Sequence, residues 1–229
     1  CANSPSSPTA ASSAEALCLE MSRLHETNPE LSIRPTPRSF NAVINAWGRS
    51  TQPDSARNAE AFLDAMELNY ALTNNPDQKP NTINYNSVLN AWANSGSESS
   101  PHQTERLLRR MQDSHRSGDD YVKPNSISFN AVIDSWAKSG AEFAGRRAEQ
   151  ILVSMEELYA SGENLDVKPN TRSYNAVMNA YAKSRDKDAA VMAQRLLERM
   201  EELYGGGNLD VKPDFFSFAT VINAWGRSE

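Results

Sequence analysis

The sequence contains little cysteine and little histidine, which limits the redox and metal chemistry it can support. Among its 229 residues there are two cysteines and three histidines. Two cysteines form no disulfide framework, a usage typical of a reducing compartment. The histidines stand apart from any cysteine or carboxylate at metal-ligand spacing. We therefore expect neither a metal site nor a cofactor.

Long apolar runs are also missing. No stretch approaches the roughly 20 apolar residues that a helix needs to cross a bilayer, so we expect no membrane association. The first residues are rich in Ser, Pro and Ala and lack the basic and apolar regions of a signal peptide. We interpret residues 1–13 as a disordered linker. Because the chain does not begin with Met, we expect a fragment whose targeting sequence lies upstream.

Catalytic patterns and positive charge are scarce as well. Glu156 and Glu157 are adjacent, so they point to different helix faces and make a poor acid–base pair. The glycines at 205–207 are followed by no Lys-Ser or Lys-Thr, which excludes a phosphate-binding loop. We expect no enzyme activity here, and any catalytic domain would lie outside this chain. The net charge of −6 is unusual for a nucleic-acid binder, which usually carries a basic excess.

What the sequence does contain is an internal repeat. Segments such as SFNAVINAWGRS and SYNAVMNAYAKS recur, with steps of 45, 44, 45 and 44 residues between their aromatic residues Phe40, Tyr85, Phe129, Tyr174 and Phe218. A methionine follows each of the first four aromatics at a constant distance of 26 residues, at Met66, Met111, Met155 and Met200. The variation in length therefore falls after the methionine, as is typical of a loop.

Each repeat is predicted to form two helices. In the first repeat Phe40, Val43, Ile44 and Trp47 have the spacing of an amphipathic helix, and a similar pattern precedes each methionine. Each unit ends on Lys-Pro-Asn or Lys-Pro-Asp, whose last residue can cap the next helix. Helix pairs bury their apolar faces by stacking. We predict an all-α solenoid of tandem antiparallel helix pairs, comprising a partial repeat 14–36, repeats 37–81, 82–125, 126–170 and 171–214, and a truncated repeat 215–229. The loops 70–80, 114–123, 160–168 and 204–212 are expected to project and to be mobile.

A row of asparagines follows the core aromatics, at Asn41, Asn86, Asn130 and Asn175. Asparagine is a poor helix former, so its recurrence here favours a specific role. Its amide offers two donors and an acceptor, which suits a nucleic-acid base edge. The alternative is that these amides bond to the neighbouring repeat and hold the stack together. The first helices carry a small positive charge, whereas the acidic second helices, Glu149 among them, are expected to be solvated.

The pattern (Phe/Tyr)-Asn-x-(Val/Leu)-(Ile/Leu/Met)-(Asn/Asp)-(Ala/Ser)-(Trp/Tyr)-x-(Lys/Arg), the second helix closed by Met and the final Lys-Pro-(Asn/Asp) resemble the pentatricopeptide repeat. The resemblance covers residues 14–229, although these repeats are longer than the family's usual unit of about 35 residues. It implies a right-handed superhelix that binds single-stranded RNA, one base per repeat. It further implies a part in RNA processing, stability or translation in a mitochondrion or plastid. The alternative function is a protein–protein interaction scaffold of the tetratricopeptide type, and protein partners could also bind through flanking regions.

The resemblance also implies roles for individual residues. Base-reading pairs would be Asn41 with Asn81, Asn86 with Asn125, Asn130 with Asn170, and Asn175 with Asp214. Base-clamping side chains would be Ile83, Ile127, Arg172 and Phe216, with Arg38 at the same position of the first repeat. Phosphate-facing residues would be Arg49, Lys138, Lys183 and Arg227, whereas Asn94 departs from the pattern. Asn paired with Asn or Asp implies a preference for pyrimidine-rich RNA, with uracil at the fourth repeat.

Overall fold

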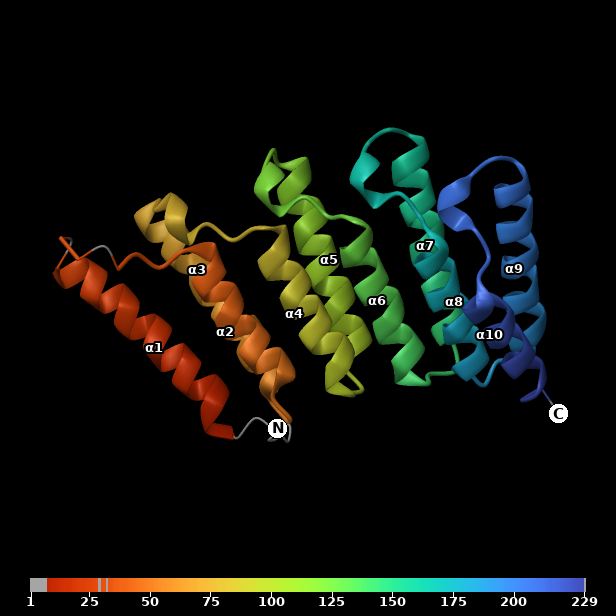
Figure 1. Ribbon diagram of the computed structural model, residues 1–229, viewed down its shortest axis with the longest axis horizontal. Helices are drawn as coiled ribbons and strands as arrows, with labels where there is room; N and C mark the ends of the chain where they lie inside the picture. Colours follow the sequence, from red (N-terminus) through yellow and green to blue (C-terminus); the bar gives the residue numbers. More distant parts are fainter. Residues whose placement is uncertain (1–7, 29, 32, 229) are drawn as a thin grey trace. The chain divides into compact units, whose positions relative to one another are not determined.

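Regular structure is entirely helical in the part of the chain that the computed structural model describes, which is residues 8–28, 30–31 and 33–228 (Figure 1). The α-helices are α1 (Pro8–Thr27), α2 (Pro37–Arg49), α3 (Ser55–Thr73), α4 (Thr82–Ser95), α5 (Ser100–Arg116), α6 (Ser126–Ser139), α7 (Ala144–Ala160), α8 (Thr171–Lys183), α9 (Ala189–Gly205) and α10 (Phe215–Trp225). Short 3-10 turns are η1 (Pro76–Gln78), η2 (Asp120–Val122), η3 (Leu165–Val167) and η4 (Leu209–Val211). The predicted all-α architecture is confirmed.

The even-numbered helices α2 to α10 are the first helices of successive repeats, and α3, α5, α7 and α9 are the second helices. The first helices α4, α6, α8 and α10 each begin one residue after a side chain that caps them. At α6, Asn125 accepts from the N–H of Ser128 at 3.2 Å, and the Asn125 N–H donates to the Ser128 hydroxyl, also at 3.2 Å. This reciprocal pair satisfies amide groups that the first turn leaves without partners. Together with the preceding proline, it fixes where each repeat starts.

The chain divides into two compact units, one of Cys1–Ser95 with Arg110–Lys123 and one of Gly96–Arg109 with Pro124–Glu229. In the first unit α2 packs against α1, α3 and α4. In the second unit α8 packs against α6, α7, α9 and α10. Each of these first helices therefore contacts its own second helix and the first helix of an adjacent repeat, which is the stacking of a solenoid. The equivalent core positions Ile44, Leu89, Ile133 and Met178 are fully buried.

Helix α1 begins at Pro8, inside the range that composition assigned to a disordered linker. Its sequence explains the difference, because proline is tolerated in the first turn and the following alanines are the best helix formers. Ala11 and Cys18 are buried, and α1 packs on α2. Residues 1–7 of the expected linker lie outside the described residues. No described helix has the length and apolar character that crossing a bilayer requires.

The long loops contain short 3-10 turns with specific contacts, and the expectation that these loops are mobile stays a prediction. An Asn or Asp side chain caps each turn by accepting the N–H two residues further on, at Asn75, Asp119, Asn164 and Asn208. A buried valine closes three of the turns, at Val122, Val167 and Val211. The hydroxyls of Thr82 and Thr171 each donate at 2.7 Å to a lysine carbonyl of the following loop. These bonds tie the loops to the helices.

A polar contact near the end of each first helix joins it to the second helix of the preceding repeat, with α1 in that role for α2. The indole N–H of a tryptophan or the hydroxyl of a tyrosine donates to a carboxylate on that helix, and in one case to an amide oxygen. The pairs are Trp47 with Glu15 at 2.9 Å, Trp92 with Glu60 at 2.7 Å, Trp136 with Glu105 at 2.8 Å, Tyr181 with Glu149, and Trp225 with Gln194 at 3.0 Å. We call this recurring bond the staple.

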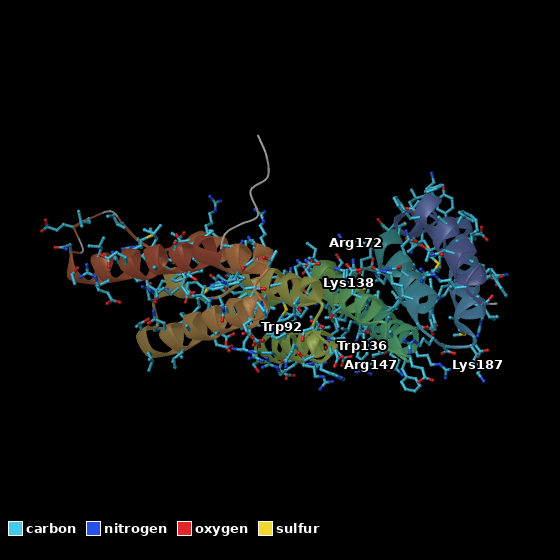
Figure 2. All side chains as sticks on the ribbon, turned by 90° about the horizontal axis from the view of Figure 1, so that it is seen from below. Trp92, Trp136, Lys138, Arg147, Arg172 and Lys187 are labelled. Carbon is cyan, nitrogen blue, oxygen red and sulfur yellow. The ribbon has the colours of Figure 1, made fainter. Side chains whose placement is uncertain are left out.

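Glu105, the acid of one staple, also binds an arginine. The two carboxylate oxygens of Glu105 accept from Nε and Nη2 of Arg147 at 2.7 and 2.6 Å, so the pair is bidentate. Burial of the Glu105 carboxylate opposes its ionisation, but the hydrogen bonds from Arg147 and Trp136 outweigh burial and hold its pKa below the ordinary value. Figure 2 shows Trp136 and Arg147 toward the same side of the second unit. Glu105 is therefore charged at neutral pH.

Where the core aromatic is tyrosine, its hydroxyl forms a further contact, a bridge through a glutamate to an arginine. The Tyr85 hydroxyl donates to Glu67, which also pairs with Arg110. The Tyr174 hydroxyl donates to Glu156, whose other oxygen accepts from Arg199 at 2.7 Å. In the repeat between these two the aromatic is phenylalanine, and the positions of the acid and the arginine hold Gln112 and Ser154.

We expect Glu105→Gln to lower the free energy of unfolding by roughly 1–3 kcal/mol at neutral pH, the usual loss for hydrogen bonds to a charged group. Urea unfolding followed by circular dichroism measures it, with Glu157→Gln on exposed α7 surface as the matched control. Because the pKa of Glu105 is depressed, its contribution is present above the ordinary value of 4.5 and is lost as pH falls through the depressed pKa. Equal stability of both variants at neutral pH would contradict the role of the staple.

Candidate nucleic-acid interface

The starts of α2 and α4 enclose a hollow in the first unit. Its volume is about 700 Å³, and its lining residues are Thr36, Pro37, Arg38, Asn41, Asn81 and Ile83. Two of these are the expected base-reading pair of the first repeat, and two occupy the expected clamp position of consecutive repeats. The structure therefore brings together side chains that lie 40 or more residues apart in the sequence.

The two asparagines of this hollow use their carbonyl oxygens within the protein. Asn81 Oδ1 accepts from the N–H groups of Ile83 at 2.9 Å and Asn84 at 3.2 Å, as the cap of α4. Asn41 Oδ1 accepts from the Ser87 hydroxyl at 2.8 Å. Both acceptor positions of the Asn81 oxygen are therefore filled, so Asn81 can offer only N–H donors to the hollow, whereas Asn41 can offer donors and one remaining acceptor position.

The last residues of the other repeats are also helix caps. Asn125 caps α6, Asn170 caps α8 with a 3.2 Å bond from the Ser173 N–H, and Asp214 caps α10 with a 3.0 Å bond from the Ser217 N–H. Capping alone accounts for an Asn or Asp at these positions. It also fixes each side chain rigidly at a helix start.

The asparagines that follow the core aromatics differ in accessibility. Asn86 and Asn130 are only 7% and 4% exposed, whereas Asn41 and Asn175 are half-buried. Asn130 Oδ1 is buried and has no hydrogen-bond partner among the described residues. An unpaired buried acceptor carries a desolvation cost. The four side chains are therefore not equivalent, although the sequence places them alike.

Asn175 and Asp214 meet directly. Asn175 Nδ2 donates to Asp214 Oδ1 at 3.0 Å, and the Ser217 hydroxyl donates to Asn175 Oδ1 at 2.7 Å. Burial opposes ionisation of Asp214, but hydrogen bonds from Ser217 and Asn175 prevail and lower its pKa. The pair thus presents a remaining amide N–H beside a carboxylate. Asn41 and Asn175 both contact the next first helix, so the stacking role that the sequence left open is present at these two positions.

The expected clamp residues are all on the surface. Ile83, Ile127 and Phe216 are 63%, 55% and 68% exposed. Arg172 is also exposed and pairs with Asp134 at 3.2 Å. Their exposure leaves the apolar side chains at this position of the three helices accessible to solvent.

The four expected phosphate-facing residues, Arg49, Lys138, Lys183 and Arg227, are exposed. Arg227 donates to the Ala182 carbonyl at 3.2 Å, so its guanidinium is positioned by α8. In Figure 2 Lys138 and Arg172 lie toward one side of the second unit, and Trp136 and Arg147 lie toward the other. Within that unit the cationic positions are therefore separate from the staple.

Sequence reasoning missed the staple, although its signal is present. An acid stands six residues before the methionine at Glu15, Glu60, Glu105 and Glu149, and Gln194 replaces it in the last unit. Glu149, on the acidic second helix α7, has a structural contact that the sequence did not indicate, because its carboxylate accepts the Tyr181 hydroxyl. Thr36 and Pro37 of the hollow were also missed. Among the described residues no cluster of His, Cys, Asp and Glu could hold a metal ion.

Comparison with known proteins gives two similarities. Residues 157–228 match the family described as the pentatricopeptide repeat domain. The crystal structure of the pentatricopeptide repeat protein PPR10 from maize is similar at 20% sequence identity, covering 91% of this chain and 34% of that one, with a TM-score of 0.34. This chain thus spans about a third of the maize protein's length. No curated protein sequence matches it.

The caps can be tested apart from any ligand. We expect Asn125→Ala to lower the free energy of unfolding by about 1 kcal/mol, because alanine leaves the N–H groups of the first turn of α6 without an acceptor. Asn125→Asp keeps an acceptor oxygen and should retain the stability of the parent. Urea titration of the three proteins measures both effects. An equal loss in the two variants would show that capping is not what Asn125 contributes.

Proposed function

We propose, from the premise that this chain is a pentatricopeptide repeat protein, that it binds single-stranded RNA along the starts of its first helices, one base per repeat. The observation that carries the proposal is the hollow between α2 and α4, which combines Asn41 and Asn81 with the clamp positions Arg38 and Ile83. Its volume of about 700 Å³ lies within the usual range for small-ligand pockets.

The chemistry of the hollow suits a stacked base. Ile83 offers an apolar face and Arg38 a guanidinium plane, and both kinds of group stack on bases. The amides of Asn41 and Asn81 offer N–H donors, and the oxygen of Asn81 is already engaged by two bonds. Pyrimidines carry carbonyl acceptors, and the smaller ring fits between two clamping side chains. We therefore propose a preference for pyrimidine-rich RNA.

The fourth complete repeat supports uracil in particular. An N–H of Asn175 lies beside the carboxylate of Asp214. Uracil presents the complementary order, a carbonyl acceptor next to its ring N–H. Cytosine presents an unprotonated ring nitrogen at that place, which a carboxylate repels. The lowered pKa of Asp214 keeps this carboxylate charged at neutral pH.

The net charge of −6 sets the expected strength of binding. At most four first-helix cations would contact phosphates, Arg49, Lys138, Lys183 and Arg227. Four contacts to a single strand give a logarithmic salt slope of roughly −3. Affinity would thus come mainly from base stacking, which contributes about 1–3 kcal/mol per base. By the family's usual roles, the protein would act without catalysis on organellar transcripts, in their processing, stability or translation.

A protein-interaction scaffold is the second candidate, and one observation favours it. Asn86 and Asn130 are nearly inaccessible, so two of the four expected readers cannot contact a base without local movement. A scaffold would use the exposed clamp-position residues as a plain apolar contact surface. The two functions differ in whether RNA binding depends on the amide of Asn41.

We expect Asn41→Ala to weaken binding to a pyrimidine oligonucleotide roughly fivefold, the loss of about one hydrogen bond. Asn58→Ala on α3 makes the same chemical change in the same unit but outside the hollow, and should leave affinity unchanged. Fluorescence anisotropy with labelled RNA measures both. If the affinity for RNA were unchanged in Asn41→Ala, or equal for purine and pyrimidine tracts, the scaffold function would be favoured.

We expect Asp214→Asn to shift the preferred base at one position from uracil toward cytosine, since a neutral amide can donate to the cytosine ring nitrogen. The cap of α10 is kept, because asparagine caps as well as aspartate does. Competition between oligonucleotides that differ only at that base gives the ratio of affinities. An unchanged ratio would remove Asp214 from base recognition.

A further inference from the structure

A groove lies between the second helices α7 and α9, wholly within the second unit, and we call it the α7–α9 groove. Its volume is about 580 Å³. Six of its lining residues come from α7 and recur at helical spacing along one face, from Arg146 to Glu157. Asp188 and Met192 line it from the start of α9, and Tyr181, which is fully buried, closes the bottom. The proposed RNA face is formed by the starts of first helices, so this groove is a separate surface.

Two apolar side chains of the α7–α9 groove stand where the other second helices carry polar ones. Val153 is 37% exposed, and Met192 is half-buried. Arg195 contacts the Met192 sulfur at 3.7 Å but does not line the groove. Counted back from the methionine that closes each second helix, the equivalents of Val153 are Asp64, Arg109 and Glu198, and those of Met192 are Asn58, Gln103 and Arg147. Both walls of the groove are thus apolar at positions that are elsewhere polar or charged.

The equivalent place between α3 and α5 is bridged by an ion pair. There Arg110 of α5 donates to Asp64 of α3 at 2.7 Å. At the α7–α9 groove the corresponding Arg199 bonds to Glu156, and a valine stands at the position of the bridging acid. Val153 is therefore accessible, and the space above it can receive an apolar side chain of a ligand.

The charge of the groove lining is negative. Glu149, Glu157 and Asp188 are among the lining residues. The one cation of the lining is Arg146, and its guanidinium already binds Asp186, which is not a lining residue, at 2.7 Å. An acidic surface attracts a cationic ligand and repels phosphate groups. A ligand that is both apolar and basic therefore fits the groove, whereas RNA and an anionic membrane do not.

The form of the ligand follows from the length and the walls of the groove. Glu157 lies 11 residues after Arg146, which is about 17 Å along the helix axis, or about three turns. Both walls are helices whose backbone amides are bonded internally, so an extended strand would find no backbone partners, whereas a helix supplies its own. We propose that the α7–α9 groove binds an amphipathic helix of a partner protein, with apolar residues on one face and Lys or Arg beside them.

This protein contact would be separate from RNA binding and does not rest on it. Figure 2 shows Arg147 of α7 and Lys187, which precedes α9, toward one side of the second unit, and Lys138 and Arg172 toward the other. The partner helix would thus bind on the side of the second helices. The cations that we propose to face phosphates would stay accessible.

Fluorescence anisotropy with a labelled synthetic peptide tests the apolar part of the proposal on the full chain. The peptide has about 18 residues, enough to form a helix, with leucines at helical spacing on one face and lysines elsewhere. We expect Met192→Gln to weaken its binding roughly tenfold, because an apolar contact is lost. Gln103 holds the equivalent position of α5, so the variant should fold. Val191→Gln changes an exposed apolar neighbour outside the lining and should leave affinity unchanged.

The acidic lining is tested with the same peptide. Glu157→Gln should weaken binding about two- to fivefold, as expected for one exposed ion pair, and the affinity should then fall less steeply with added salt. Glu202→Gln, on exposed α9 surface outside the lining, is the matched control. A peptide with glutamate in place of lysine should bind at least tenfold more weakly, because like charges would meet.

Three results would overturn the proposal. The first is that the leucine–lysine peptide does not bind the parent protein. The second is that its affinity is the same for the parent, Met192→Gln and Glu157→Gln, since the peptide would then bind elsewhere. The third is equal binding of a peptide with the same residues in shuffled order, which keeps the charge but has no apolar face.

Discussion

The buried hydrogen bond between an aromatic side chain and the acid of the preceding second helix is the contact on which the stack depends. Apolar packing alone lets two helices turn or slide with little penalty, but a carboxylate removed from water must keep its donor. Trp92 and Trp136 therefore fix the rotation of α4 and α6 about their axes. That rotation determines which side of each first helix carries the asparagine row and the clamp position. The arrangement of the interface follows from a bond on another side of the same helix.

The polar residues that we propose as base readers also have structural roles. Asn81 and Asp214 cap helices, and Asn41 and Asn175 bond to the next first helix. Each bond engages an oxygen, and the three asparagines keep amide hydrogens available. The stacking role and the base-reading role are thus compatible, since the first holds the side chain in the orientation that the second requires. A pre-oriented donor loses less entropy on binding than one on a mobile side chain.

The repeat starts could be predicted because Lys-Pro followed by a capping residue is a local signal. The 3-10 turns were not predicted, since a three-residue turn with one buried valine, such as Val167, leaves too short a pattern. The spacing of the apolar residues places Glu149 on the polar face of α7, but only the packing of the helices shows that Glu149 contacts Tyr181. The unequal burial of Asn130 and Asn175 likewise depends on neighbouring helices, so identical motifs could not reveal it. The hollow joins two repeats and has no continuous sequence signal.

The bridge of tyrosine, glutamate and arginine occurs in the second and fourth complete repeats, at Tyr85 and Tyr174. The first and third repeats have phenylalanine at this position. With steps alternating between 45 and 44 residues, the sequence has a longer period of 89 residues, as from Phe40 to Phe129 and from Tyr85 to Tyr174. In a linear array, stability is a sum of unit terms and nearest-neighbour terms. Here the polar contacts across successive junctions differ in kind, because the tyrosine bridge joins the first repeat to the second and the third to the fourth, whereas the bidentate pair of Arg147 with Glu105 joins the second to the third. The contact pattern therefore repeats over a doublet, so the same substitution made in neighbouring repeats would have different costs.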